Sequence, residues 1–384
     1  MKDRSPRVAA RLLALLAVAT LVAGCSSLNP FSRKGPQVAP LPPLVSPVEV
    51  TITAQTKVGS SEGLFLTPAV LDNEAIVAGG DGRVLRWNGG VRWEAKLEEG
   101  IIAGVGSDER LAVVVTRKGD AVAFAVDDGA VRWRHPLKAD VITPPLVASG
   151  LVVVRTADYR LIALDARDGK ERWVYQRNLP PLSLRQSAPL VSAGNAIVAG
   201  YPGGTIAVLD PRSGAPLFEL TVASPKGATE IERLTDVVGP PLVARQEVCA
   251  AAYQGRVACF DGRTAETIWA KDLSSRTGID RDYRYVVVTA DNDDVVALDA
   301  YSGKEQWRTG GFSWRLLTRP LILGDWVLVG DREGYVHALD RNDGRIRGRV
   351  RVGSGPILVE PRAIGPNRAV VQNTDGTVAI VEVH

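Results

Sequence analysis

Histidine, cysteine and methionine are scarce in this 384-residue chain, with three, three and one residues, and aromatic residues make up only 6%. His135, His337 and His384 do not stand at metal-ligand spacing from one another or from a cysteine, so no metal site is expected. A nucleophile elbow, a P-loop and a complete dinucleotide-binding fingerprint are also missing. We therefore expect no catalytic residues and no cofactor.

Beyond residue 24, the chain has no excess of positive or negative charge. The formal net charge is +3, and residues 1–24 supply all of it with four basic residues and one acidic residue. The remainder of the chain is close to neutral. A nucleic-acid partner would need a basic face to neutralise phosphates, so none is expected.

The N-terminus has the pattern of an export signal that ends at a cysteine. An apolar run from Leu12 to Ala23 follows the basic residues. It has about the length of a secretory signal and is short of the roughly 20 residues of a membrane-spanning helix. Ala23 and Gly24 directly before Cys25 resemble the bacterial lipoprotein signal, which implies a signal peptide over 1–24 and acylation of Cys25. An ordinary cleaved signal, in which Cys25 is incidental, is the alternative.

The residues after Cys25 extend this interpretation. Ser26 stands where an Asp would imply retention at the inner membrane, so the implied location is the periplasmic face of the outer membrane. Residues 25–46 are rich in proline and have few periodic apolar positions, which is typical of a semi-extended tether. A single folded domain is then expected over 47–384.

The body of the chain is repetitive, and the repeat indicates the fold. Ala163-Leu164-Asp165 with Gly169 and Trp173 recurs as Ala297-Leu298-Asp299 with Gly303 and Trp307. Looser or shortened copies bring the number to eight, about 40 residues apart; they are marked by Trp93, Gly129 with Trp133, Asp210 with Gly214 and Phe218, Asp261 with Trp269, Asp340 with Gly344, and a truncated copy at Val378-Ala379-Ile380.

Each repeat has the pattern of short antiparallel strands. β-branched runs such as Leu151–Arg155 precede the motif, and turn signals such as Gly203-Gly204 separate the runs. Four strands in about 40 residues form the blade of a β-propeller, with the Asp-x-x-x-Gly segment as the turn between the third and fourth strands and the Trp as an apolar plate between blades. The sequence therefore predicts an all-β, eight-bladed propeller. An open β-solenoid is the rival architecture.

The truncated last copy predicts how the ring closes. It lacks its final strand, whereas the alternating segment Val48–Gln55 at the other end of the chain belongs to no blade. Pairing the two would remove both exposed sheet edges. We expect this N-terminal strand to complete the eighth blade.

Two chemical alternatives remain open from the residues. Asp291-Asn292-Asp293-Asp294 could suggest calcium, but its spacing is wrong for an EF-hand and its position matches a hairpin turn. The repeat also resembles that of the periplasmic pyrroloquinoline-quinone dehydrogenases. Those enzymes are longer and typically carry adjacent cysteines beside the quinone, which this chain lacks.

Two connections between repeats are longer than the others, and loops of this kind often carry function on a rigid scaffold. They cover residues 177–188 and 222–239. Leu182 and Leu184 in the first point the same way if the segment is extended, next to Arg185, which is the composition of an interface anchor; burial of both leucines in the core is the alternative. The second could be a short helix capped by Thr229, an extended rim segment or a plain solvated loop.

These connections resemble the BamB family, lipoprotein propellers of the machinery that inserts β-barrels into the outer membrane. The resemblance rests on residues 182–189, 229–237, 315–318 and 330–335. It implies a non-enzymatic scaffold whose two loops contact the POTRA domains of BamA, the barrel-forming subunit. The implied contact residues are Leu182, Leu184, Arg185 and Asp236, with Glu230, Glu232 and Arg233 as weaker candidates; other subunits and nascent barrel proteins are further candidate partners.

The chain departs from the family pattern at one of these positions. A second acid is expected two residues after Asp236, and Val238 stands there instead. The acidic part of the contact is then expected to be weaker, or to be supplied by Glu230 or Glu232, and an aspartate at position 238 should preserve or strengthen binding.

Cys249 and Cys259 are the remaining cysteines, and they flank a turn centred on Gln254. A three-residue turn would place them on facing strands with both side chains on one face, whereas a two-residue turn would point them to opposite faces. The periplasm is oxidising, which favours a disulfide over two buried thiols.

Overall fold

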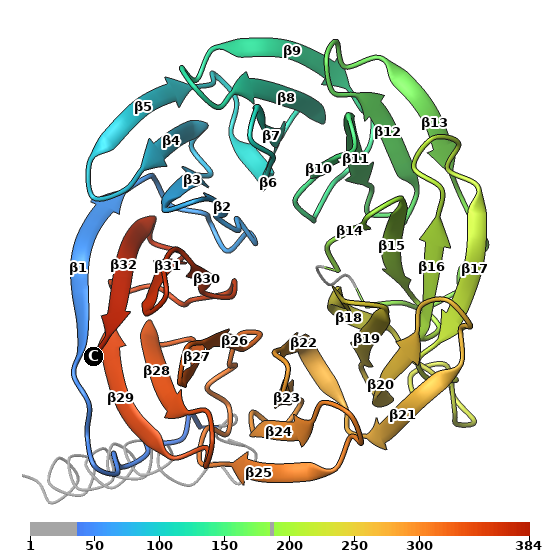
Figure 1. The fold of residues 1–384 in the computed structure, drawn as a ribbon. Coiled ribbons are helices and arrows are strands. Elements are labelled where there is room, and N and C mark those ends of the chain that lie inside the picture. Colours follow the sequence, from blue (N-terminus) through green and yellow to red (C-terminus); the bar gives the residue numbers. More distant parts are fainter. Residues whose placement is uncertain (1–36, 185–187) are drawn as a thin grey trace, which may run out of the picture. The chain divides into compact units, whose positions relative to one another are not determined.

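Eight four-stranded sheets, each antiparallel throughout, are arranged in a ring in the compact unit formed by Ala39–His384 (Figure 1). The computed structural model describes residues 37–184 and 188–384. No helix occurs in this described part of the chain, and in particular none long and apolar enough to cross a membrane. The predicted all-β, eight-bladed propeller is confirmed.

The first seven blades each use four consecutive strands. Blades 1 and 2 comprise β2 (Ala69–Leu71), β3 (Glu74–Ala78), β4 (Arg83–Trp87), β5 (Val91–Lys96), β6 (Ile101–Ser107), β7 (Leu111–Thr116), β8 (Asp120–Ala125) and β9 (Val131–Pro136). Blades 3 and 4 comprise β10 (Leu146–Ala148), β11 (Leu151–Arg155), β12 (Leu161–Asp165), β13 (Glu171–Tyr175), β14 (Val191–Ala193), β15 (Ala196–Tyr201), β16 (Thr205–Leu209) and β17 (Pro216–Thr221). Blades 5 and 6 comprise β18 (Val237–Ala244), β19 (Glu247–Ala252), β20 (Arg256–Asp261), β21 (Thr267–Asp272), β22 (Ser275–Arg281), β23 (Tyr285–Ala290), β24 (Val295–Asp299) and β25 (Glu305–Thr309). Blade 7 comprises β26 (Leu321–Leu323), β27 (Trp326–Gly330), β28 (Tyr335–Asp340) and β29 (Ile346–Arg351).

Blade 8 joins the two ends of the described chain. It consists of β30 (Arg362–Ala363), β31 (Arg368–Gln372) and β32 (Thr377–Val383), with β1 (Val50–Lys57) as its outermost strand. β1 pairs antiparallel with β32 from Val50 opposite Val383 to Lys57 opposite Thr377, with one irregularity near Thr53. The predicted closure is confirmed. Because β1 and β32 pair with each other, the edge of β32 that faces outward is not left without a hydrogen-bonded neighbour.

The segment before β1 lies along blade 7. Backbone N–H groups of Val45 and Val48 donate to carbonyl oxygens of Ile346 and Arg347 in β29 at 2.9 Å. Gly348 in β29 makes room for this approach, since a Cβ there would lie 2.4 Å from Cγ2 of Val50. The part of the predicted tether that follows Ala39 therefore packs against the propeller.

The core is divided among the interfaces between blades. Eight apolar clusters of buried residues each join two neighbouring blades, and the last joins blade 8 to blade 1. The second and third strands of a blade are therefore covered on both faces, which explains continuous apolar runs such as that of β11. Outer strands such as β9 alternate between buried and exposed residues because only one face is covered. No blade has a complete core without its neighbours.

The repeated tryptophans connect adjacent blades as predicted. The Trp173 indole N–H donates across the interface to the carbonyl oxygen of Pro211 at 2.8 Å, and Trp133 bonds Ala166 in the same way at 2.9 Å. Equivalent bonds join Trp93 to Val126, Trp269 to Ala300 and Trp307 to Arg341. Each indole thus combines an apolar plate with one directed hydrogen bond.

Candidate interaction site

All connections between blades emerge on the same face of the ring. Because the four strands of a blade alternate in direction, the chain leaves the outer strand at the end that holds the turn between the second and third strands. The connection after β25 accordingly meets the β23–β24 turn, where the Asp293 carboxylate accepts hydrogen bonds from the backbone N–H groups of Leu316 and Leu317 at 3.2 and 3.0 Å. We call this the connector face.

The first long connection, residues 176–190 between β13 and β14, keeps Leu182 and Leu184 away from the core. Leu182 is 40% exposed, and Leu184 is half-buried. Leu179 and Leu190 are the leucines of this connection that pack into the cluster between blades 3 and 4. Arg185, predicted to contact a partner, lies outside the described residues. The interpretation of Leu182 and Leu184 as core residues is thus not supported.

The backbone of Leu184 is held from two sides. Its N–H donates to the Asp236 carboxylate at 2.6 Å, and its carbonyl oxygen accepts from the Tyr159 hydroxyl at 2.6 Å. Asp236 precedes β18 at the end of the second long connection and also accepts from the backbone N–H of Gly203 at 3.3 Å. The two long connections are therefore joined directly through Asp236.

A buried arginine holds the far end of the first connection. Arg155, at the end of β11, is 2% exposed and donates to the carbonyl oxygens of Ala188 and Gly200. Its guanidinium lies 5.0 and 4.9 Å from the ring centres of Tyr159 and Tyr201. Burial lowers the pKa of Arg155 because it removes the guanidinium from water. The two carbonyl oxygens and the faces of the two tyrosine rings stabilise the buried cation in place of water.

The second long connection, residues 222–236, contains one capped turn and not a helix or an extended segment. The Glu232 N–H donates to the Thr229 hydroxyl at 3.3 Å, and the Glu232 carboxylate accepts from the N–H of Thr229 at 3.1 Å. This reciprocal pair is the capping box expected from Thr-x-x-Glu. It leaves Ile231 67% exposed, with Glu230 and Arg233 exposed beside it and 4.0 Å apart.

Asp236 and Val238 differ from the surface residues that the sequence led us to expect. Asp236 is 3% exposed, and burial raises its pKa despite the two N–H groups that it accepts. Its position suits it to hold Leu184 in place. Val238 is 1% exposed within the apolar cluster between blades 5 and 6. The expectation for an aspartate at position 238 must therefore be corrected: it would bury a charge among apolar side chains and destabilise the fold.

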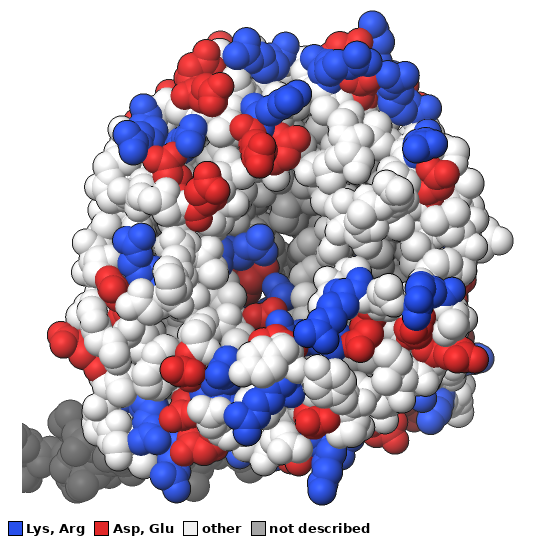
Figure 2. Space-filling model, in the orientation of Figure 1, with Lys and Arg blue, Asp and Glu red and all other residues white. Residues whose placement is uncertain are grey.

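Charge of both signs is distributed over the molecule. In the face that Figure 2 shows, Lys and Arg alternate with Asp and Glu, and broad uncharged areas separate them. No continuous patch of one sign is visible on this face. The pattern agrees with the near-neutral charge of the chain beyond residue 24 and offers no extended phosphate-binding surface here.

The Asp-rich segment 291–294 forms the predicted hairpin turn between β23 and β24. Asp293 is buried and accepts from Arg276 at 2.9 Å in addition to the two backbone N–H groups given above. Its carboxylate is thus used to hold the next connection. In residues 37–184 and 188–384, no group of three His, Cys, Asp or Glu side chains is placed to share a metal ion.

Residues 315–318 and 330–335, which carried part of the family resemblance, meet in one buried network. The Arg315 guanidinium is 1% exposed and donates to the Asp331 carboxylate at 2.7 Å, and to Glu333 at 2.5 Å. The Nε2 atom of His337 lies 2.9 Å from Oδ2 of Asp331, the same oxygen that accepts from Arg315. Burial alone would raise the pKa of Asp331, but its bonds from His337, Tyr335 and Arg315 lower it.

Comparison with known proteins decides the family. The sequence model of the family described as "Outer membrane protein assembly factor BamB" matches residues 73–309 and 292–384. The protein of that name from Bordetella pertussis is 37% identical over 387 residues, covering 99% of each chain. The chain belongs to the BamB family. The resemblance stated from the sequence is therefore confirmed.

Solved structures agree with this assignment. The crystal structure of BamB from Moraxella catarrhalis superposes with a TM-score of 0.80 at 29% identity, covering 87% of this chain and all of that one. The quinohemoprotein alcohol dehydrogenase from Comamonas testosteroni gives a TM-score of 0.68 at 13% identity, covering 87% and 76%. The second likeness shows only a common propeller fold, so nothing specific supports the quinoprotein alternative for this BamB-family chain.

Sequence reasoning did not find the residues that position the first connection. Arg155 follows the apolar residues Leu-Val-Val-Val in β11. A charged residue at the end of a buried strand is a sequence signal that could have indicated a buried arginine. Tyr159 lies in an ordinary turn and gives no such signal. The link between Asp236 and Leu184 joins residues 52 positions apart, which no local pattern contains.

Proposed function

We propose that this protein is a lipid-anchored, non-enzymatic scaffold of outer-membrane protein assembly, held at the periplasmic face of the outer membrane through acylated Cys25. In this proposal its connector face binds the POTRA domains of BamA. The family assignment supports a role in outer-membrane protein assembly. The attachment and the partner come from the resemblances in the sequence.

The observation that carries the proposed interface is the junction at Leu184. Ordering a flexible loop on binding costs free energy, so an exposed leucine contributes more to affinity when its loop is already held in place. Asp236 and Tyr159 hold the Leu184 backbone, and Arg155 holds Ala188. The described parts of the loop, up to Leu184 and from Ala188 onward, are therefore held before the partner arrives, with Leu182 and Leu184 as the proposed anchors. Arg185 follows Leu184 in the sequence and is the third proposed contact.

In this arrangement Asp236 is a positioning residue and not a direct contact. Glu230, Glu232 and Arg233 lie on the exposed turn of the second connection and are the weaker contact candidates. Of these, Glu232 is engaged by the capping box, and its bonds from Thr229 and Ala228 lower its pKa. Glu230 and Arg233 are freer to pair with charges on the partner.

Binding of full-length variants to BamA in detergent tests the proposal. Leu184→Ala and Arg185→Ala should each weaken binding by about 1–3 kcal/mol, as interface anchors do. Leu217→Ala is the matched control, because Leu217 is 54% exposed on outer strand β17, away from the connector face. Unchanged affinity for both loop variants would refute the proposed interface.

The role of Asp236 is tested by combining stability with affinity. Asp236→Ala leaves the N–H groups of Leu184 and Gly203 without their acceptor, which should cost about 1–3 kcal/mol of folding stability. Asp236→Asn keeps one acceptor oxygen, so it should reduce folding stability and affinity for BamA less than Asp236→Ala does. Wild-type affinity in an Asp236→Ala variant that still folds would show that the loop needs no such support.

A further inference from the structure

Two apolar side chains on the connector face are presented from an unfavourable backbone conformation. Trp314 is 50% exposed with φ of 62°, and Leu316 is 36% exposed with φ of 52°. Residues other than glycine, asparagine and aspartate rarely adopt this left-handed region, and it costs of order 1–3 kcal/mol per residue. Folding alone gives no reason to place a large apolar residue at either position.

The surrounding structure enforces this presentation. Arg315, between the two, is buried and paired with Asp331, while the Asp293 carboxylate accepts from the N–H groups of Leu316 and Leu317. The Arg315 side chain also donates to the carbonyl oxygen of Ala39 at 2.6 Å. The connection between blades 6 and 7 is thus fixed from its inner side and turns Trp314 and Leu316 outward.

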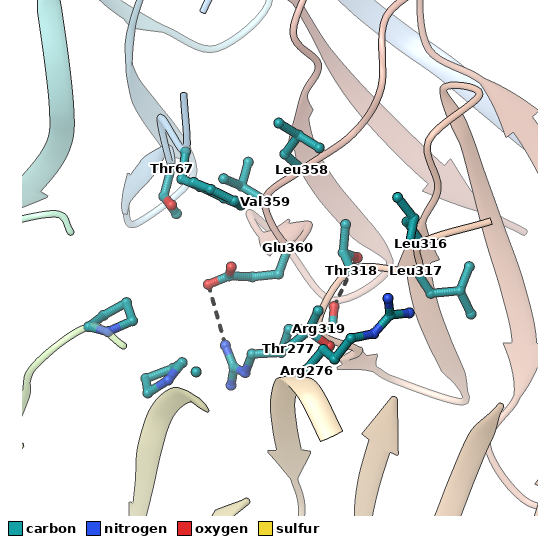
Figure 3. Close-up of a pocket in the computed structure, with 14 residues that line it drawn as sticks. Thr67, Arg276, Thr277, Leu316, Leu317, Thr318, Arg319, Leu358, Val359 and Glu360 are labelled. Carbon is teal, nitrogen blue, oxygen red and sulfur yellow. Dashed lines mark hydrogen bonds and ion pairs between the residues drawn. The ribbon is translucent and has the colours of Figure 1, made fainter. Parts of the chain in front are cut away.

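Leu316 borders a cavity of about 240 Å³ at the same face. Figure 3 shows Leu316 and Leu317 on one side of it, Leu358 and Val359 on another, and Glu360 reaching toward Arg319. The exposed side chain of Phe65 adds a further apolar wall. Because drug-sized ligands occupy pockets of roughly 300–1,000 Å³, this cavity fits a single large side chain better than a cofactor.

The charges of the cavity point to an uncharged occupant. Its three charged lining residues are already paired: Arg276 with Asp293 at 2.9 Å, and Arg319 with Glu360 at 3.4 Å and with Asp280 at 3.3 Å. An anion or a cation would have to compete with these pairs. An apolar side chain would instead cover the leucines and leave the ion pairs intact.

The cavity continues the proposed BamA interface. Pro189, near the end of the first long connection, and Gly239 and Pro240, in β18 just after the second, form part of its wall. A stable complex buries about 800 Å² on each partner, from some 20–30 residues, which two leucines and an arginine cannot supply alone. The contact must extend over the neighbouring surface, where Phe65, Trp314 and Leu316 are exposed apolar side chains.

We propose that this cavity, with Leu316 at its rim, receives one large apolar side chain of the same partner that binds the Leu182–Leu184 loop. In this proposal the exposed Trp314, on the same connection as Leu316, contacts that partner outside the cavity. The inference rests on the proposed function and gives the partner a second point of attachment. Two separated points fix an orientation, which a single loop does not.

The test compares three full-length variants with a control. Leu316→Asn removes an apolar side chain at the rim of the cavity, and Trp314→Asn removes the exposed one beside it on the same connection. Asparagine suits a positive φ, so the melting temperature should stay the same or rise while affinity for BamA falls about ten-fold. Thr277→Phe, on the cavity wall, should lower affinity by filling the site. Tyr301→Asn is the control: Tyr301 is 58% exposed in the β24–β25 turn, on the opposite face, and its loss should not affect affinity.

Each outcome has a distinct meaning. If Leu184→Ala weakens binding and the three cavity variants do not, the inference is wrong and the proposed function stands. If Leu184→Ala and Arg185→Ala have no effect either, the proposed interface itself fails. A photo-crosslinker at position 314 in cells should capture BamA; capture of a second copy of this chain or of a nascent barrel protein instead would overturn the choice of occupant.

Discussion

The indole of Trp133 lies directly against the α-carbon of Gly169 in the next blade. A Cβ on Gly169 would lie 2.6 Å from Cε3 of the indole, closer than such atoms approach in proteins. Gly169 also has φ of 71°, and its N–H donates to the Asp165 carbonyl oxygen at 2.9 Å. The repeated glycine thus serves two purposes: it permits the turn, and it makes room for the tryptophan of the preceding blade.

Replacement of Gly169 by alanine should therefore cost more stability than the turn conformation explains. Gly150→Ala is the matched control, since Gly150 has φ of 76° but nothing within 4 Å of a Cβ. The control should lose about 1–2 kcal/mol of unfolding free energy in denaturant titration, and Gly169→Ala should lose clearly more. Equal losses would mean that the indole moves aside without cost.

The interface between blades 4 and 5 offers the reverse experiment. Phe218 stands there in place of the tryptophan, and Ala265, with φ of 61°, stands in place of the glycine. Both pack against the cluster that joins these blades. Phe218→Trp alone should destabilise the protein, and adding Ala265→Gly should recover most of the loss, with a coupling energy of about 0.5–3 kcal/mol. Strictly additive effects would contradict the pairing.

These pairs show what a sequence can and cannot reveal. The spacing from Asp165 through Gly169 to Trp173 predicts the turn and the apolar plate, because both depend on neighbours in the chain. The pairing of Trp133 with Gly169, by contrast, exists only when blades stand side by side. The same distinction explains why the local pattern could place Leu182 and Leu184 outside the core, whereas it could not predict the burial of Asp236 and Val238.

Acid should weaken the buried network of blade 7. Burial lowers the pKa of His337 below its ordinary value of 6.5, although Asp331 acts in the opposite direction. The folded protein then binds the proton less readily than the unfolded chain. The stability contributed by neutral His337 is present above pH 6.5 and is lost as pH falls below it, with a slope of up to about 1.4 kcal/mol per pH unit.

Unfolding free energies measured between pH 7.5 and 5.5 test this contribution. His337→Gln should flatten the slope, whatever its effect on absolute stability. His135→Gln is the control, since it removes a histidine from outer strand β9, which is not part of the blade 7 network. An unchanged slope in His337→Gln would assign the pH dependence to other groups.

Cys25→Ser tests the proposed membrane anchor; Cys25 lies outside the described residues. The variant should leave the membrane fraction or accumulate as the unprocessed precursor, because a serine cannot carry the thioether-linked lipid. Its melting temperature should not change, since the apolar clusters begin well after this position. Unchanged outer-membrane fractionation would rule out acylation of Cys25 as the anchor.

The disulfide between Cys249 and Cys259 allows a direct chemical test. The two residues face each other across β19 and β20, with Cα atoms 4.1 Å apart, because residues 253–255 form a three-residue turn between the strands. Both are fully buried, so they cannot be alkylated in the native state.

We expect neither to react after unfolding without reductant, and both to react once reductant is added. The bond closes a short loop, so the double Cys→Ala variant should lose no more than about 3 kcal/mol. Mass spectrometry that finds two alkylated thiols at these positions before reduction would show that the bond does not form in the cell.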